Sequence, residues 1–178
     1  MPGPCGKPLS FEGKTPRLGR NVFIDPGARV IGDVSLGDDV AILFAAAVRG
    51  TDDSVSVGSG TVILEHAFVE APQGHPVRIG ERVLISHGAI VHGAVIGDGS
   101  LIGIGARVLD GAVVGPGSIV AAGAVVPPGK TVPPGVIVAG IPARPLRNVT
   151  ARDLERVARE LELVHSKVPG YRRALGCE

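Results

Sequence analysis

The sequence predicts an all-β solenoid, a parallel β-helix followed by one C-terminal α-helix. Three observations lead to this fold class: aliphatic residues recur every six positions, glycine is abundant, and large rings are scarce. The 178 residues include 27 glycines and 15 prolines, but only four Phe, one Tyr and no Trp. A core without large rings must be filled by small branched side chains in a regular arrangement, which stacked short strands provide.

The repeat begins at Ile24 and continues to Val138. The predicted inward-facing aliphatic residues are Ile24, Val30, Leu36, Ile42, Val48, Val57, Ile63, Val69, Ile79, Ile85, Ile90, Ile96, Ile102, Val108, Val114, Val120, Val126, Val132 and Val138. A period of six fits no α-helix. It fits short strands joined by turns, where glycine is favoured because it adopts positive φ without strain.

We therefore expect three segments: an N-terminal extension over 1–20, the β-helix over 21–145, and an amphipathic helix with a tail over 146–178. Thr150 followed by Asp153 resembles the capping box that begins many helices. Apolar residues then follow at helical spacing: Leu154, Val157, Ala158, Leu161 and Val164. This helix should lie against the β-helix or a neighbouring subunit, although a partner-binding helix is an alternative.

Composition excludes several function classes. Eighteen basic and seventeen acidic residues leave a formal charge of +1, and neither a basic stripe nor aromatic stacking platforms indicate nucleic acid. No apolar run approaches the length of a membrane span, and the first residues lack a signal-like apolar stretch. Cys5 and Cys177 lie near opposite ends without CxxC spacing. A disulfide is one option, but free thiols in a cytoplasmic protein are the default expectation.

The period of six is interrupted three times, and function is expected where a regular pattern is broken. Three extra residues follow Val48 around "TDDS", and four extra follow Val69 around "PQGHP". One residue is missing between Ile85 and Ile90. With three strands per coil, Val48, Val69 and Ile90 fall on one face. Both inserted loops therefore leave from the same corner of the solenoid.

This count of faces brings Arg49, Glu70 and His92 together in three consecutive coils. Glu65 and His87 stack on the adjacent face, so His87 cannot easily reach His92 within one chain. A neighbouring chain in a parallel trimer can supply it. Two histidines and a carboxylate offer three ligands and leave an open position, in a set that suits Zn²⁺ or Fe²⁺. The alternative is that both histidines are exposed turn residues.

At these residues the chain resembles the gamma-class carbonic anhydrase family. The motifs are "AVRG", "VLISHGAIVHGAVIG", "LIGIGARVLDGAVV" and "AGIPARPLR", within residues 20–165. The resemblance implies a left-handed β-helix and a homotrimer with one metal ion at each subunit interface. It also implies that a metal-bound hydroxide attacks CO₂, giving bicarbonate. Glu70 and His92 of one chain would hold the metal with His87 of the next.

Several positions depart from the family pattern. Glu70 stands where the family has its first histidine ligand. The Asn and Gln of the family's "TNIQD"-like motif become Val62 and Leu64, and leucine cannot form hydrogen bonds. The Asp of that motif becomes Glu65.

The "RGD" motif of the family reads "RGT" in this chain. It keeps Arg49, an interface residue in the family, and has Thr51 at the Asp position. The catalytic candidates are therefore Glu65, Thr51 and Asp52, which lies where some family members carry a proton-shuttling acid. A solvated loop charge is the alternative for Asp52.

His75, on the second inserted loop, is a further candidate ligand, and His66 should face solvent. Because a carboxylate ligand is anionic, the bound water should be less acidic than in a three-histidine site. We therefore expect weak CO₂ hydration at neutral pH that improves as pH rises.

Two other function classes fit the sequence. A hexapeptide acyltransferase would use acyl-CoA, with His87 or His92 as the general base. A catalytically inactive scaffold or assembly trimer would result from losing the family's Asn, Gln and first His together.

Overall fold

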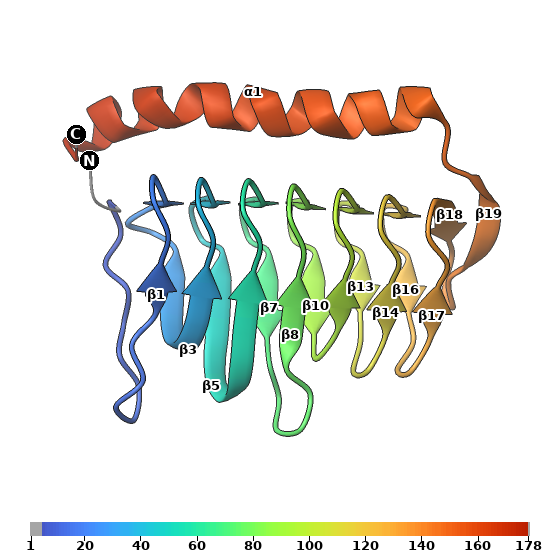
Figure 1. Cartoon of the computed structure of the whole chain (residues 1–178), viewed down its shortest axis with the longest axis horizontal. Helices are drawn as coiled ribbons and strands as arrows, with labels where there is room; N and C mark the ends of the chain where they lie inside the picture. Colours follow the sequence, from blue (N-terminus) through green and yellow to red (C-terminus); the bar gives the residue numbers. More distant parts are fainter. Residues whose placement is uncertain (1–4, 178) are drawn as a thin grey trace.

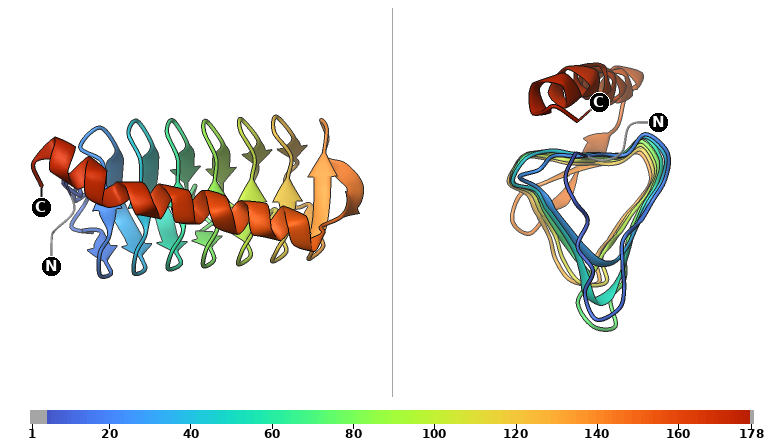
Figure 2. Two further views of the ribbon diagram at one scale, coloured as in Figure 1. Left: turned by 90° about the horizontal axis from the view of Figure 1, so that it is seen from above. Right: turned by 90° about the vertical axis from the view of Figure 1, so that its left-hand side faces the viewer.

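The computed structural model describes residues 5–177 and shows a triangular β-solenoid with one long helix beside it (Figures 1 and 2). The solenoid is the predicted left-handed β-helix of hexapeptide repeats. Each coil contributes a strand to each of three faces, and equivalent strands of successive coils pair in parallel. The last pair, β18 with β19, is antiparallel and closes the end of the stack.

One face is covered by the helix, α1 (Ala151–Leu175), and we call it the helix face (Figure 2). Its strands are β2 (Phe23–Ile24), β4 (Ala41–Ile42), β6 (Val62–Ile63), β9 (Leu84–Ile85), β12 (Leu101–Ile102), β15 (Ile119–Val120), β18 (Val136–Ala139) and β19 (Arg144–Asn148). Every second side chain of these strands points away from the solenoid interior and is available to pack against α1.

The other two faces share one sheet, because β3 (Arg29–Leu36) and β5 (Ala47–Val57) run continuously around the corner between them. We call one of these two faces the histidine face, because its strand β10 (Ile90–His92) ends at His92. Besides parts of β3 and β5, it contains β7 (Phe68–Glu70), β13 (Arg107–Val108) and β16 (Val125–Val126). The third face begins with β1 (Arg17–Leu18) and continues with β8 (Val77–Ile79), β11 (Val95–Ile96), β14 (Val113–Val114) and β17 (Thr131–Val132).

The interior is a column of buried aliphatic side chains, as the period of six predicts. Of the predicted inward residues, all are buried except Ile90, which is half-buried. The prediction for Ile90 is wrong by one position, because Val91 pairs with Val69 and fills the interior. The missing residue therefore lies between Val91 and Ile96, not between Ile85 and Ile90. This moves the third interruption to the end of the histidine face.

The helix α1 begins as predicted. Thr150 and Asp153 form a capping box, in which each side chain bonds the other's backbone N–H. Val157 and Leu161 are buried against outward side chains of the helix face, including Phe23 and Leu84. The sequence also assigned Leu154 to this apolar side, but Leu154 is exposed in the structure.

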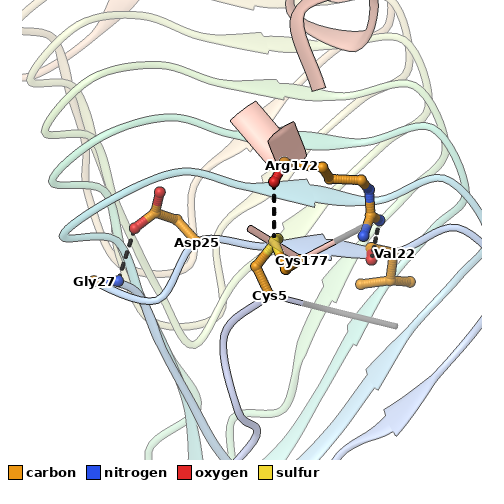
Figure 3. The surroundings of a disulfide bond; sticks show 6 residues. All are labelled: Cys5, Val22, Asp25, Gly27, Arg172 and Cys177. Carbon is orange, nitrogen blue, oxygen red and sulfur yellow. Dashed lines mark hydrogen bonds between the residues drawn. A yellow bond between two sulfur atoms is a disulfide. The ribbon is translucent and has the colours of Figure 1, made fainter. Parts of the chain in front are cut away.

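The two ends of the described chain meet at one end of the solenoid, because α1 runs back along its whole length (Figure 1). Cys5 and Cys177 form a disulfide there, with their Cα atoms 5.3 Å apart (Figure 3). The expectation of free thiols is therefore wrong, since sequence separation hides this proximity. Beside it, Arg172 is buried and donates a hydrogen bond to the carbonyl oxygen of Val22 at 3.0 Å.

The N-terminal segment takes part in the first coil rather than standing apart from it. β1 pairs with β3, and Leu9 forms an isolated bridge with Ile31. Pairing thus begins upstream of residue 21, the expected start of the β-helix. Among residues 5–177, no helix is both long and apolar enough to cross a membrane.

Candidate metal centre

All three interruptions lie at the corner between the histidine face and the third face, which we call the loop corner. The first insertion lies within β5, the second forms the loop over residues 71–76, and the shortened turn follows Val91. The longer loops extend beyond the regular coils in Figure 1. His92 ends β10 at this corner, and its position follows directly from the five-residue step between Val91 and Ile96.

A row of polar side chains crosses the coils at the loop corner. Arg49 pairs in register with Glu70, and Glu70 with His92, so the predicted stacking is confirmed. The Arg49 guanidinium donates a hydrogen bond to Glu70 Oε1. Glu70 Oε2 lies 3.7 Å from His92 Nε2, and the Glu70 side chain is only 14% exposed. This row therefore holds a largely shielded carboxylate between a guanidinium and an imidazole.

The row continues to Asp110, a residue that sequence reasoning missed. His92 Nδ1 forms a hydrogen bond with Asp110 Oδ1 in the following coil. A signal for it exists in the sequence: His92-Gly93 and Asp110-Gly111 occupy the same turn in successive coils, and the Gly111 N–H donates to the Gly93 carbonyl oxygen. Aligning coils by their turn glycines would have found Asp110.

His87 occupies a different corner, between the helix face and the histidine face, which we call the His87 corner. As predicted, it stacks on Glu65, with 2.8 Å between His87 Nδ1 and Glu65 Oε2. The His87 side chain is 52% exposed, whereas Glu65 Oε2 is buried and has no hydrogen bond of good geometry among the described residues. His87 thus presents its ring to solvent in front of a buried carboxylate.

His87 and His92 are too far apart along the strand to share a ligand within one chain. His87 lies in the turn that precedes β10 and His92 is the last residue of β10, so the two histidines occupy opposite corners of the histidine face. Within residues 5–177, no three His, Cys, Asp or Glu side chains are placed to hold a metal ion together. One chain therefore contributes Glu70 and His92 at one corner and His87 at another.

The remaining candidates lie around these two groups. Thr51 and Asp52 are in the first insertion, where the Thr51 hydroxyl donates to Asp52 Oδ2 at 3.2 Å, and Asp52 is exposed. His75 is exposed on the second loop, which packs so closely that a Cβ on Gly93 would lie 2.8 Å from the His75 Cβ. His66 is exposed, as predicted, and its ring meets the Phe44 ring edge-on.

The apolar substitutions are explained by packing under the helix. Val62 and Leu64 are both buried in the cluster that joins the helix face to α1. A groove of about 700 Å³ runs along this cluster and reaches the His87 corner, with Leu64, Glu65, Ser86 and His87 in its lining. Aliphatic side chains therefore occupy the side of His87 where the related family places polar residues.

A left-handed β-helix with a C-terminal helix and histidines on two corners defines the chain as a hexapeptide-repeat protein. Residues 93–128 match the family model described as "Bacterial transferase hexapeptide (six repeats)". Among solved structures, a hexapeptide transferase family protein from Anaplasma phagocytophilum superposes with a TM-score of 0.87 at 33% identity. That match covers 92% of this chain and 96% of the other.

Sequence relatives narrow the class to a family. A "Probable carbonic anhydrase" of Methanocaldococcus jannaschii is 41% identical over 79% of this chain and 88% of its own length. A "Carbonic anhydrase" of Geobacillus kaustophilus is 33% identical over 84% of each chain. "Gamma carbonic anhydrase 1, mitochondrial" of Arabidopsis thaliana is 38% identical, over 48% of this chain and only 33% of its own length. The chain belongs to the gamma carbonic anhydrase-like family of hexapeptide-repeat proteins.

Proposed function

We propose that this protein is a gamma-carbonic anhydrase-like homotrimer that binds one divalent metal ion, Zn²⁺ or Fe²⁺, at each subunit interface and hydrates CO₂ weakly. Glu70 and His92 of one protomer would hold the metal with His87 of the next. The names of the Methanocaldococcus and Geobacillus relatives support the activity, and this chain's own side chains support the ligand set.

One observation carries the proposal: each histidine has a carboxylate at Nδ1 and leaves Nε2 available. Asp110 bonds His92 Nδ1, and Glu65 lies 2.8 Å from His87 Nδ1. Histidines that bind metals usually have their other ring nitrogen paired with a carboxylate or carbonyl group, which fixes the ring and raises its basicity. Two exposed turn histidines with no shared function would not need this arrangement.

The spacing between Glu70 and His92 also fits one metal ion. Zn²⁺ binds oxygen and nitrogen ligands at about 2.1 Å, so two ligands of a tetrahedral ion lie about 3.4 Å apart. Glu70 Oε2 and His92 Nε2 are separated by 3.7 Å. Only a small movement would bring both atoms to one ion, while Glu70 Oε1 keeps its hydrogen bond from Arg49.

The surroundings of His87 support its being at a subunit interface. Phe44 and Ile104 occupy the same corner, two coils before and one coil after His87, and are 50% and 58% exposed. Backbone hydrogen bonds link these turns, from His66 to Phe44 and from Gly105 to His87. Large exposed apolar side chains gathered around a polar group are typical of an interaction surface. In the proposed trimer this corner meets the loop corner of the next protomer.

A divalent metal held by these residues would lower the pKa of its bound water and so supply the nucleophile for CO₂. The chain's own residues set the limits of the activity. Glu70 is an anionic ligand in place of a neutral imidazole, and Leu64 cannot orient a water molecule or the substrate. Activity should therefore be weak at neutral pH and increase as pH rises.

Metal content of protein purified without chelator tests the proposal. We expect close to one Zn²⁺ or Fe²⁺ per chain in the wild type and almost none in Glu70→Ala. Glu81→Ala is the control, because Glu81 is exposed on a different corner. A metal-free wild type would refute the metal centre. Metal without CO₂ hydration at any pH, in stopped-flow measurements, would instead indicate a scaffold trimer.

A second candidate function is acyl transfer from acyl-CoA. The groove of about 700 Å³ favours it, because an apolar channel leads to an imidazole backed by the Glu65 carboxylate, as a general base requires. The Anaplasma structure, described as a hexapeptide transferase family protein, has the same fold. Protection against thermal unfolding by acetyl-CoA, lost in His87→Ala, would support this alternative over the hydration of CO₂.

A further inference from the structure

We propose that Asp110 is a positioning residue whose carboxylate keeps the proton of His92 on Nδ1 and so keeps Nε2 available for a metal ion. The metal-binding consequence rests on the proposed function. Which nitrogen of the His92 ring carries the proton does not depend on the proposed function, so the tautomer and the metal binding can be tested separately.

The contacts of the His92 ring support this assignment. An ionised carboxylate only accepts hydrogen bonds, so the bond between Asp110 Oδ1 and His92 Nδ1 requires the proton on Nδ1. On the other side, Nε2 is 3.7 Å from Glu70 Oε2, which is longer than a hydrogen bond. The Nε2 atom therefore faces the Glu70 carboxylate without donating to it, as expected of two groups that can bind one cation.

The backbone explains why Asp110 reaches His92. The shortened turn after Val91 leaves Gly93 directly beneath the Asp110 turn, and the Gly111 N–H donates to the Gly93 carbonyl oxygen at 2.7 Å. A Cβ on Gly93 would lie 2.9 Å from Asp110 Oδ1, so a side chain there would displace the carboxylate. The one-residue deletion thus determines where His92 lies and also brings the Asp110 carboxylate next to its ring.

The other proposed ligand gives an internal comparison. Glu65 also lies beside the Nδ1 atom of its histidine, but without a hydrogen bond of good geometry in the single chain. His92 alone is already fixed by a carboxylate before any partner subunit is present. Asp110 should therefore orient its ligand even in the metal-free protein.

Metal affinity is the first test, measured as Zn²⁺ competition with a chromophoric chelator on the 178-residue protein. Asp110→Asn keeps an acceptor oxygen but removes the charge, and Asp110→Leu removes both. We expect affinity about 10-fold weaker for the first and about 100-fold weaker for the second. Asp98→Asn is the matched control, because its carboxylate accepts from the Glu81 N–H at another corner. Unchanged affinity in both Asp110 variants would overturn the proposal.

The second test is ¹⁵N NMR of the neutral His92 ring in the metal-free protein, with signals assigned by their loss in His92→Gln. We expect the Nδ1–H form in the wild type and a shift toward the Nε2–H form in Asp110→Leu. An Nε2–H ring in the wild type would overturn the role of Asp110, whatever the metal affinity. If the wild type binds no Zn²⁺, the proposed function fails and the NMR result alone decides the assignment.

Discussion

Two parts of one solenoid differ in how closely they follow the repeat. From Ile96 to Val138 the inward residues recur every six positions without interruption, whereas from Val48 to Ile96 the repeat is broken three times. Both parts have an equally buried aliphatic interior. All the candidate metal ligands lie in the interrupted part, and Asp110 contacts one of them, His92, from the regular coils. Insertions and deletions at the corners therefore leave the buried interior unchanged, because corner residues do not contribute to the core.

The largest effect is expected in an experiment that tests whether the interrupted coils of two chains together form one metal site. Neither Glu70→Ala nor His87→Ala alone should bind metal. In trimers refolded from an equal mixture, a site is intact only where a His87→Ala chain supplies Glu70 and a Glu70→Ala chain supplies His87. Random assembly gives about a quarter of wild-type metal content. No recovery with excess Zn²⁺ would contradict a shared site.

The second prediction concerns the regular coils. Ile102 is fully buried in β12, so Ile102→Ala should lower the free energy of unfolding by about 2–5 kcal/mol through lost burial and a cavity. Val113→Ala, on the exposed third face, should change it far less. Both should retain metal. Chemical denaturation measures the stability and metal analysis the metal content. If Ile102→Ala lost metal while still fully folded, the metal site would not be independent of the regular coils.

The third prediction compares the same turn in the two parts. Gly93 and Gly129 both have positive φ, 58° and 66°, so an alanine at either should cost about 1–2 kcal/mol of stability. A Cβ at Gly129 meets nothing within 4 Å, whereas one at Gly93 meets His75 and Asp110. Gly93→Ala should therefore be the more destabilising and should also weaken metal binding. Equal losses of stability in thermal unfolding would show that the loop corner is not crowded.

The smallest effect concerns the helix that lies over both parts. Hydrogen bonds from Arg147, and then from Thr150, hold the pKa of the Asp153 carboxyl well below its usual range. A lowered folded-state pKa contributes stability above the unfolded value, about 3.9, and this is lost as pH falls toward the folded value. Circular dichroism should show α1 weakening below about pH 4. Asp153→Asn should flatten that dependence, whereas Glu155→Gln, an exposed neighbour, should preserve it.

The fold could be predicted from the sequence because one short-range rule determines most of it. Inward aliphatic residues and turn glycines repeat locally, so counting positions gave the coils, the faces and the stacking of Arg49, Glu70 and His92. The count failed at Ile90, where Ile90 and Val91 are both aliphatic and either could start the strand. Only the parallel pairing with Val69 decides in favour of Val91.

The rest of the site depends on contacts between coils that no local rule describes. Asp110 lies eighteen residues from His92, and its side chain meets the imidazole only because the shortened turn brings their corners together. The disulfide between Cys5 and Cys177 spans nearly the whole chain. This disulfide could be predicted only once it was known that α1 runs back along the solenoid to the first coil.

That return has a consequence for how the protein unfolds. A simple solenoid is held together by contacts between neighbouring coils, so it can fray from either end. Here α1 touches coils along the whole stack, and the bond between Cys5 and Cys177 ties its far end to the first coil (Figure 3). The β18–β19 pair closes the opposite end. With neither end free to open, the coils should melt together as one cooperative unit.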